Sequence, residues 1–85
     1  GMNILALEAR AAEVGFDENT LCVLLQDGRR ISIPLSYFPR LLKATPEQRA
    51  KYELSGAGLG IHWDEIDEDI SVPALLSGSA VQART

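Results

Sequence analysis

Apolar and polar residues alternate along the first third of the chain, which is the pattern of half-buried β-strands. Residues 10–17 place apolar side chains at every second position: Ala12, Val14 and Phe16. A polar turn at residues 17–19 follows. In residues 20–35, two runs of β-forming residues flank Asp27-Gly28, which is a strong local signal for a β-hairpin. The pattern predicts a three-stranded antiparallel meander.

The loop length decides the register of the hairpin. A two-residue loop at Asp27-Gly28 breaks the apolar face, whereas a three-residue loop at residues 26–28 pairs Val23 with Ile31 and Leu21 with Ile33. We prefer the three-residue loop, because one face of the hairpin then becomes almost wholly apolar. The opposite face carries Cys22 and Leu24. We expect a C-terminal segment or a second subunit to cover it in part.

Two short helices are predicted in the middle of the chain. Ser36 is expected to cap the first helix, which runs through Ala44. Its apolar side chains are expected to face the sheet: Leu41 and Leu42. Residues 45–48, with the sequence TPEQ, form a capping box with proline at the first helical position, and they begin a second helix through about Tyr52. This box is the clearest local signal in the sequence.

The glycine-rich residues 55–60 are typical of a loop, and an alternating run follows them. The apolar positions of this run predict a further strand: Leu59, Ile61 and Trp63. Leu54 is assigned to a partner strand across the loop. The acidic residues 64–69 are interpreted as a solvated loop next to the positive end of a last helical turn.

The last helical turn is predicted after Ser71, which is its expected N-cap, and Gly78 ends it. Its buried side chains are expected to be Leu75 and Leu76. Residues 79–85 lack periodicity and are expected to form a flexible tail. Gly1 precedes a residue that looks like an initiator methionine, and we interpret it as the remnant of a cleaved tag.

Together these elements predict a single α+β domain over residues 1–78. Its small antiparallel sheet consists of the three-stranded meander plus one or two further strands, accompanied by two short helices and the C-terminal helical turn. A chain of 85 residues has room for one domain only.

Composition and charge narrow the function classes. A hydrophobic fraction of 46% with 24% charged residues is typical of a folded protein. The net charge of −4 repels phosphate backbones and makes nucleic acid an unfavourable partner. Cys22 is the single cysteine, and no run of about 18 apolar residues indicates a membrane span. We therefore expect a cytoplasmic protein.

Four motifs in this order resemble the family catalogued as domain of unknown function 2442: DGR at 27–29, FPRLLKATPEQR at 38–49, GIHW at 60–63 and DEDIS at 67–71. The resemblance covers residues 9–78. It implies a small bacterial α+β domain with antiparallel strands and no established activity. Some longer relatives add a helix-turn-helix domain, but this sequence ends soon after Gly78, so DNA binding is not carried over. Many members are encoded beside a second small family, in an arrangement that resembles a toxin–antitoxin pair. The resemblance thus implies an antitoxin-like or partner-binding role.

The candidate metal ligands are His62, Asp64 and Asp67, with Asp69 close behind. Carboxylates and imidazole are common ligands of divalent cations. However, the sequence has no second histidine, and the acidic run lacks the glycine of a calcium loop. We therefore expect a solvated loop and assign no metal and no cofactor.

Catalytic groups are scarce in the sequence. The glycines of residues 56–60 lack the spacing and the following helix of a dinucleotide fingerprint. Cys22 lies within an apolar strand, where a thiol stays protonated and inert. The only histidine has no predicted nucleophile beside it. We expect no enzyme.

Charged residues on the helices and in the acidic run are the candidate interaction residues: Arg40, Lys43, Arg49, Asp67, Glu68 and Asp69. The sequence best fits a non-catalytic protein-interaction module with a protein partner or a second copy of itself. A small-ligand or metal-binding domain and a regulatory nucleic-acid-binding protein are the alternatives.

Overall fold

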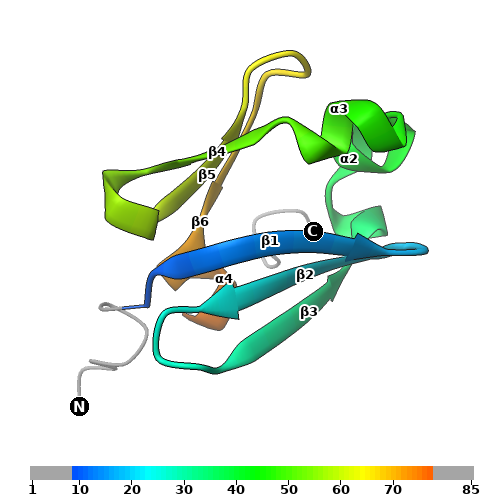
Figure 1. Cartoon of the computed structure of the whole chain (residues 1–85). Helices are drawn as coiled ribbons and strands as arrows, with labels where there is room; N and C mark the ends of the chain where they lie inside the picture. Colours follow the sequence, from blue (N-terminus) through cyan, green and yellow to red (C-terminus); the bar gives the residue numbers. More distant parts are fainter. Residues whose placement is uncertain (1–8, 78–85) are drawn as a thin grey trace.

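The computed structural model describes residues 9–77. Two three-stranded antiparallel sheets, with strand orders β1-β2-β3 and β4-β5-β6, are connected by short helices (Figure 1). The elements in chain order are β1 (Ala11–Asp17), β2 (Thr20–Leu25), β3 (Arg30–Pro34), η1 (Leu35–Tyr37), α2 (Pro39–Lys43), α3 (Pro46–Ala50), β4 (Tyr52–Ser55), η2 (Gly56–Gly58), β5 (Gly60–Trp63), β6 (Glu68–Ser71) and α4 (Val72–Ser77). The predicted α+β class is confirmed. Gly1, Gly78 and the predicted tail at 79–85 lie outside the described residues.

The first sheet has the predicted hairpin register. Leu21 pairs with Ile33 and Val23 with Ile31, as the three-residue loop requires. Gly28 has a φ of 95°, which a residue without a side chain adopts at little cost. The apolar face of the hairpin therefore points into the core.

The apolar face of β1 differs from the prediction at its first position. The pairing of β1 with β2 shifts between Ala11 and Glu13, which marks a β-bulge. Ala12 is exposed for this reason, and Ala11 is fully buried in its place. After the bulge, Val14 and Phe16 face inward as the alternation predicts.

The helical region has the predicted capping box, but it differs from the prediction at Ser36 and at Leu42. Thr45 Oγ1 accepts from the Gln48 N–H, and the Gln48 side chain accepts from the Thr45 N–H. Ser36 does not cap the first helix. It lies in the 3₁₀ turn η1, and α2 begins at Pro39 with Phe38 as its N-cap. Leu41 is fully buried, but Leu42 is 41% exposed, because a five-residue helix presents only one side to the core.

The second sheet has one strand more than the sequence predicted. Helix α3 ends at Ala50, and Tyr52 opens strand β4, which pairs with β5 across η2. Glu68 and Asp69 belong to strand β6, so the acidic run does not cap α4. The N-cap role of Ser71 agrees with a 3.4 Å hydrogen bond from the Ala74 N–H to Ser71 Oγ. Within α4, Leu75 is buried and Leu76 is half-buried.

The hydrophobic core lies between the two sheets. Its largest fully buried side chains are those of Trp63, Leu21, Leu25, Leu35, Leu41, Ile61, Val23 and Val72. Turn η2 holds the second sheet against the start of β1: a side-chain carbon on Gly58 would lie 2.5 Å from the Ala11 carbonyl oxygen. None of the helices in residues 9–77 has the length and apolar character that spanning a bilayer requires.

Candidate functional site

A groove opens between the end of β1 and helix α3, and we call it the β1–α3 groove. Its volume is about 550 Å³, within the usual range of ligand sites. One wall comes from β1 and the turn after it, and the other comes from α3 and β4. The lining residues are Val14, Gly15, Phe16, Glu18, Pro46, Arg49, Ala50 and Tyr52. Most of this lining is apolar.

Phe16 anchors the groove to the core. Its ring meets the ring of Trp63 edge to face, with centroids 6.3 Å apart and planes at 65°. The Trp63 indole N–H donates a 3.0 Å hydrogen bond to the backbone carbonyl of Arg49. Trp63 thus fixes both walls of the groove, one through its ring and one through its nitrogen.

The backbone of β1 contributes a strand edge to the groove. Strand β1 is an outer strand of its sheet, and the Val14 N–H points away from β2, donating to Tyr52 Oη at 3.3 Å. Backbone groups two residues apart in an antiparallel strand point the same way. The N–H and C=O of Phe16 therefore point toward this edge, while η2 covers the edge near Ala11.

Arg49 holds a fixed cation in the wall of the groove. Its Nε donates to the Leu41 carbonyl at 2.8 Å and its Nη2 to the Leu42 carbonyl at 2.9 Å. These are the carbonyls at the C-terminal end of α2, where a cation is favourable. The guanidinium carbon lies 5.8 Å from the centroid of the Phe16 ring. No Asp or Glu among residues 9–77 forms an ion pair with Arg49.

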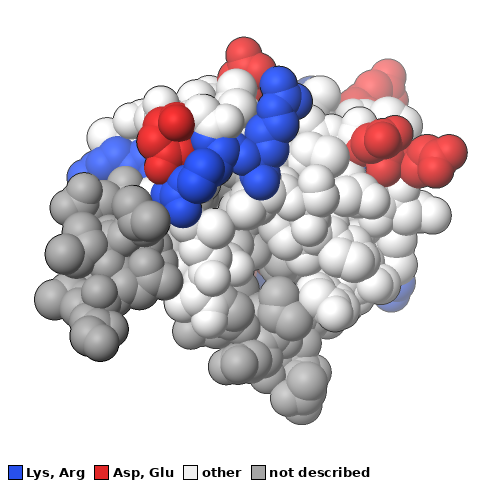
Figure 2. Space-filling model, turned by 90° about the horizontal axis from the view of Figure 1, so that it is seen from below, with Lys and Arg blue, Asp and Glu red and all other residues white. Residues whose placement is uncertain are grey.

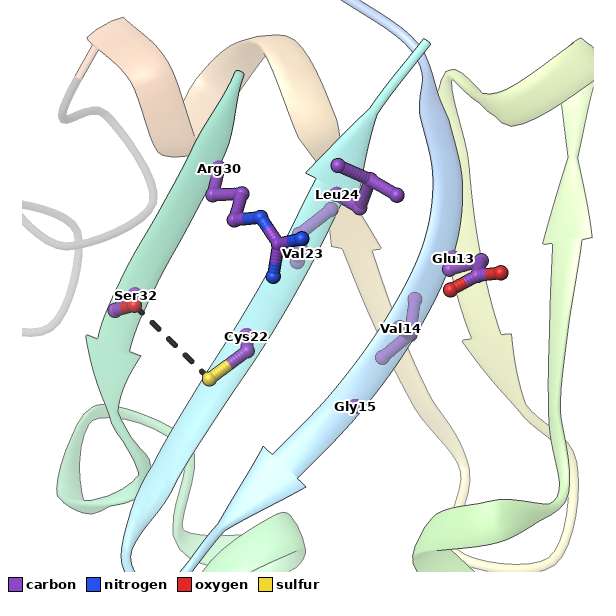
Figure 3. Close-up of a pocket in the computed structure, with 8 residues that line it drawn as sticks. All are labelled: Glu13, Val14, Gly15, Cys22, Val23, Leu24, Arg30 and Ser32. Atoms are coloured by element: carbon purple, nitrogen blue, oxygen red, sulfur yellow. Dashed lines mark hydrogen bonds between the residues drawn. The ribbon is translucent and has the colours of Figure 1, made fainter. Parts of the chain in front are cut away.

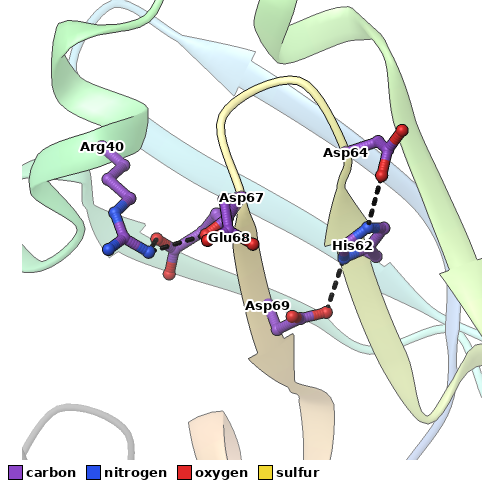
Figure 4. Close-up of polar contacts among 6 residues, drawn as sticks. All are labelled: Arg40, His62, Asp64, Asp67, Glu68 and Asp69. Carbon is purple, nitrogen blue, oxygen red and sulfur yellow. Dashed lines mark hydrogen bonds and ion pairs between the residues drawn. The ribbon is translucent and has the colours of Figure 1, made fainter.

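His62 lies on the surface of the second sheet between two carboxylates (Figure 4). Its Nδ1 is 2.7 Å from Asp69 Oδ1 and its Nε2 is 3.4 Å from Asp64 Oδ1. The hydrogen bond with Asp69, then the one with Asp64, raises the pKa of His62 above its ordinary value of 6.5. Both ring nitrogens already have partners, so neither is directed at an open coordination position.

The weak metal candidates are not gathered into one site. Asp67 contributes its backbone carbonyl to Arg40 and not a carboxylate to His62 (Figure 4). No group of three or more potential ligands within residues 9–77 is placed to hold a metal ion.

The predicted basic and acidic interaction residues are distributed over several places. Arg40 Nη1 donates to the Asp67 carbonyl at 2.6 Å and lies 4.0 Å from Glu68 Oε1, which ties α2 to the start of β6. Asp69 faces His62, Lys43 is exposed on α2, and Arg49 faces the β1–α3 groove. These residues therefore make different contacts, although the Arg49 side chain binds the carbonyls of α2, the helix that carries Arg40 and Lys43.

The outer face of the first sheet carries a smaller hollow of about 250 Å³ (Figure 3). Cys22 is a free, half-buried thiol there, 4.0 Å from Ser32 Oγ. Glu13 and Arg30 flank it. Helix α4 lies behind the sheet in this view, so this C-terminal helix does not cover the face that we expected to be covered. Residues 78–85 lie outside the described range.

Charged side chains are unevenly distributed over the face that Figure 2 shows. Seen from below Figure 1, most basic side chains lie toward the end with the β2–β3 turn, with an acidic group among them, and most acidic side chains lie toward the opposite end. At the first end, Arg29 pairs with Asp27 at 2.7 Å. The backbone N–H of Arg29 donates a hydrogen bond to Asp27 Oδ1, and this bond, followed by the side-chain pairing, lowers the pKa of Asp27.

Sequence reasoning did not find the β1–α3 groove. It selected Arg49 as an interaction residue but missed the apolar lining: Val14, Phe16, Pro46, Ala50 and Tyr52. One signal was present in the sequence. Tyr52 lies at the expected end of the short capped helix, and in the structure it opens β4 two residues after α3 ends.

Comparisons with known proteins agree with this fold. A family model described as "Protein of unknown function (DUF2442)" matches residues 11–80. A crystal structure of a protein of unknown function from Rhodospirillum rubrum is similar, with a TM-score of 0.72, 33% identity and coverage of 84% of this chain and 88% of that one. A solution NMR structure of an uncharacterized protein from Chromobacterium violaceum is also similar, with a TM-score of 0.74 and 25% identity. The match covers 91% of this chain and 72% of that one. None of the curated proteins matches the chain.

Proposed function

The chain belongs to the DUF2442 family of proteins of unknown function, and we propose that it is a non-catalytic protein-interaction module. In this proposal, the β1–α3 groove binds an extended segment of a partner protein. The observation that supports it is the combination of an apolar groove with the open edge of β1.

Strand addition is a common way to bind an extended peptide. Backbone hydrogen bonds to the edge strand supply affinity, and pockets for alternate side chains supply specificity. The backbone of Phe16 faces the edge, and its half-buried ring offers the apolar contact. Because η2 covers the beginning of β1, only its second half is available for pairing.

The chemistry of the lining favours binding over catalysis. Glu18, Arg49 and Tyr52 are its ionisable residues, and no histidine, cysteine, serine or lysine lines the groove. A nucleophile with an adjacent base is therefore missing from this site. The family resemblance implies an antitoxin-like role. If that role is right, the bound segment belongs to the protein encoded beside this one; this identity of the partner stays a prediction.

Affinity purification with a blocked groove tests the proposal. Ala50→Arg places a long side chain in the groove from an exposed position of α3, at little loss of helix propensity. Leu54→Arg is the matched control, because Leu54 is 38% exposed on β4 and does not line the groove.

We expect the wild-type chain and Leu54→Arg to recover one small protein in stoichiometric amount, and Ala50→Arg to lose it. If Ala50→Arg recovers as much of this protein as the wild-type chain does, the groove is not the binding site. Recovery of the chain alone would exclude a stable partner. A doubled mass in light scattering that is kept by Leu54→Arg and lost on Ala50→Arg would then identify a second copy of the chain as the ligand of the groove.

A further inference from the structure

Arg49 carries a charge that the described part of the chain does not neutralise. Two of the five N–H groups of its guanidinium bind the carbonyls of Leu41 and Leu42, and no carboxylate among residues 9–77 pairs with it. These two bonds fix the cation in the wall of the β1–α3 groove. The side chain is therefore preorganised for an anion.

A partner that covers the groove removes Arg49 from water. Burying a cation is unfavourable unless a counter-charge reaches it, and a carboxylate matches the planar donors of a guanidinium. An uncharged partner segment would have to leave Arg49 without that compensation. The groove therefore discriminates in favour of an acidic segment.

On this basis, and resting on the proposed function, we propose that the bound segment is an acidic peptide strand with a large apolar residue two positions from an Asp or Glu. The apolar side chain packs into the part of the groove that Phe16, Pro46 and Tyr52 line, beside the guanidinium, and the carboxylate meets Arg49. Side chains two apart in a strand share a face and stand roughly 6.6 Å apart. The Arg49 guanidinium lies only 5.8 Å from the Phe16 centroid, so two side chains of one strand face can reach both groups.

Glu18 gives the segment a polarity. It lines the groove from the turn after β1, whereas Arg49 lines it from α3. A second acidic side chain near Glu18 would be repelled. The acidic residue of the segment is therefore directed toward α3, and a neutral or basic residue suits the opposite end.

Selection from displayed random ten-residue linear peptides on the immobilised chain tests the inference. The strongest peptide is then synthesised with a fluorescent label, together with a copy in which its Asp or Glu is changed to Asn or Gln. Fluorescence anisotropy measures both on the wild-type chain, Arg49→Gln, Ala50→Arg and Leu54→Arg. Circular dichroism checks that each variant is folded.

We expect the selected peptides to share the apolar–x–acidic pattern, and the amide copy to bind at least about tenfold more weakly to the wild-type chain. On Arg49→Gln, the acidic and amide peptides should bind alike. Leu54→Arg should bind as the wild type does. The comparison of the two peptides on the wild-type chain does not depend on any variant folding.

The remaining outcomes separate the two ideas. Peptides that share an apolar residue, show no acidic preference and are lost on Ala50→Arg overturn this inference but leave the proposed function standing. No enrichment over the bare support, or binding that Ala50→Arg leaves intact, overturns both. If phenylacetate displaces the peptide at equal concentration, the groove takes a small carboxylate and the peptide assignment is wrong.

Discussion

The Arg49 guanidinium lies 5.8 Å from the centroid of the Phe16 ring, so a cation from α3 and an aromatic ring from β1 meet across the groove. The backbone of Arg49 accepts from Trp63, and its side chain binds the end of α2. The two walls of the groove are thus held by the same contacts that close the core. Substitutions in the core should therefore also change the shape of the groove.

A comparison of alanine substitutions at Gly58 and Gly28 distinguishes the cost of a steric clash from the cost of backbone strain. The two glycines have nearly the same φ, 97° and 95°, but only Gly58 has a backbone neighbour where a side chain would start. Gly28→Ala should cost about 1–2 kcal/mol from strain alone. Gly58→Ala should cost at least about 2 kcal/mol more, because η2 must move away from Ala11. Urea denaturation measures both, and equal losses would show that the Ala11 contact gives way easily.

Leu41 and Leu42 are neighbours in the sequence with different environments. Leu41 is 0% exposed and Leu42 is 41% exposed. Leu41→Ala should destabilise the fold by about 2–5 kcal/mol, the usual range for a buried leucine. Leu42→Ala should change stability by less than about 1 kcal/mol. Similar losses in chemical denaturation would contradict the orientation of α2.

The capping box at Thr45 sets the start of α3 and hence the position of Arg49. Thr45→Ala should lower the free energy of unfolding by about 1 kcal/mol, since the Gln48 N–H loses its acceptor. Thr45→Ser keeps the hydroxyl and should stay close to the wild type. Denaturant midpoints of the three chains test this. An unchanged midpoint for Thr45→Ala would mean that Pro46 and tertiary contacts hold the helix alone.

His62 gives the stability a pH dependence. Its pKa is raised in the folded state, so its ion pairs contribute stability that is complete below the unfolded pKa of 6.5 and is lost as pH rises through the folded pKa. Asp69→Asn should therefore lower the Tm more at about pH 5.5 than at about pH 9. An NMR titration should place the His62 midpoint above 6.5 in the wild type. A Tm difference independent of pH, or a midpoint at or below 6.5, would exclude this coupling.

Local signals in the sequence determined the first sheet and the second helix. The Asp27-Gly28 turn and the apolar alternation of β2 and β3 leave one register that buries a continuous face, and the structure has that register. The capping box identified the start of α3 for a similar reason, because its hydrogen bonds join residues three apart. Where local interactions determine the structure, the sequence alone was sufficient to predict it.

Tertiary structure decided what depends on contacts between distant residues. Strand β6 escaped prediction because Glu68 and Asp69 form a strand by pairing with Trp63 and His62 of β5, and acidic residues carry little strand preference of their own. The bulge that buries Ala11 lies where the distant Gly58 approaches the backbone of β1. The β1–α3 groove combines residues from β1, α3 and β4, so no single segment encodes it. The sequence by itself determined the fold class and the chemistry available, whereas packing of the two sheets decided which of those side chains share a surface.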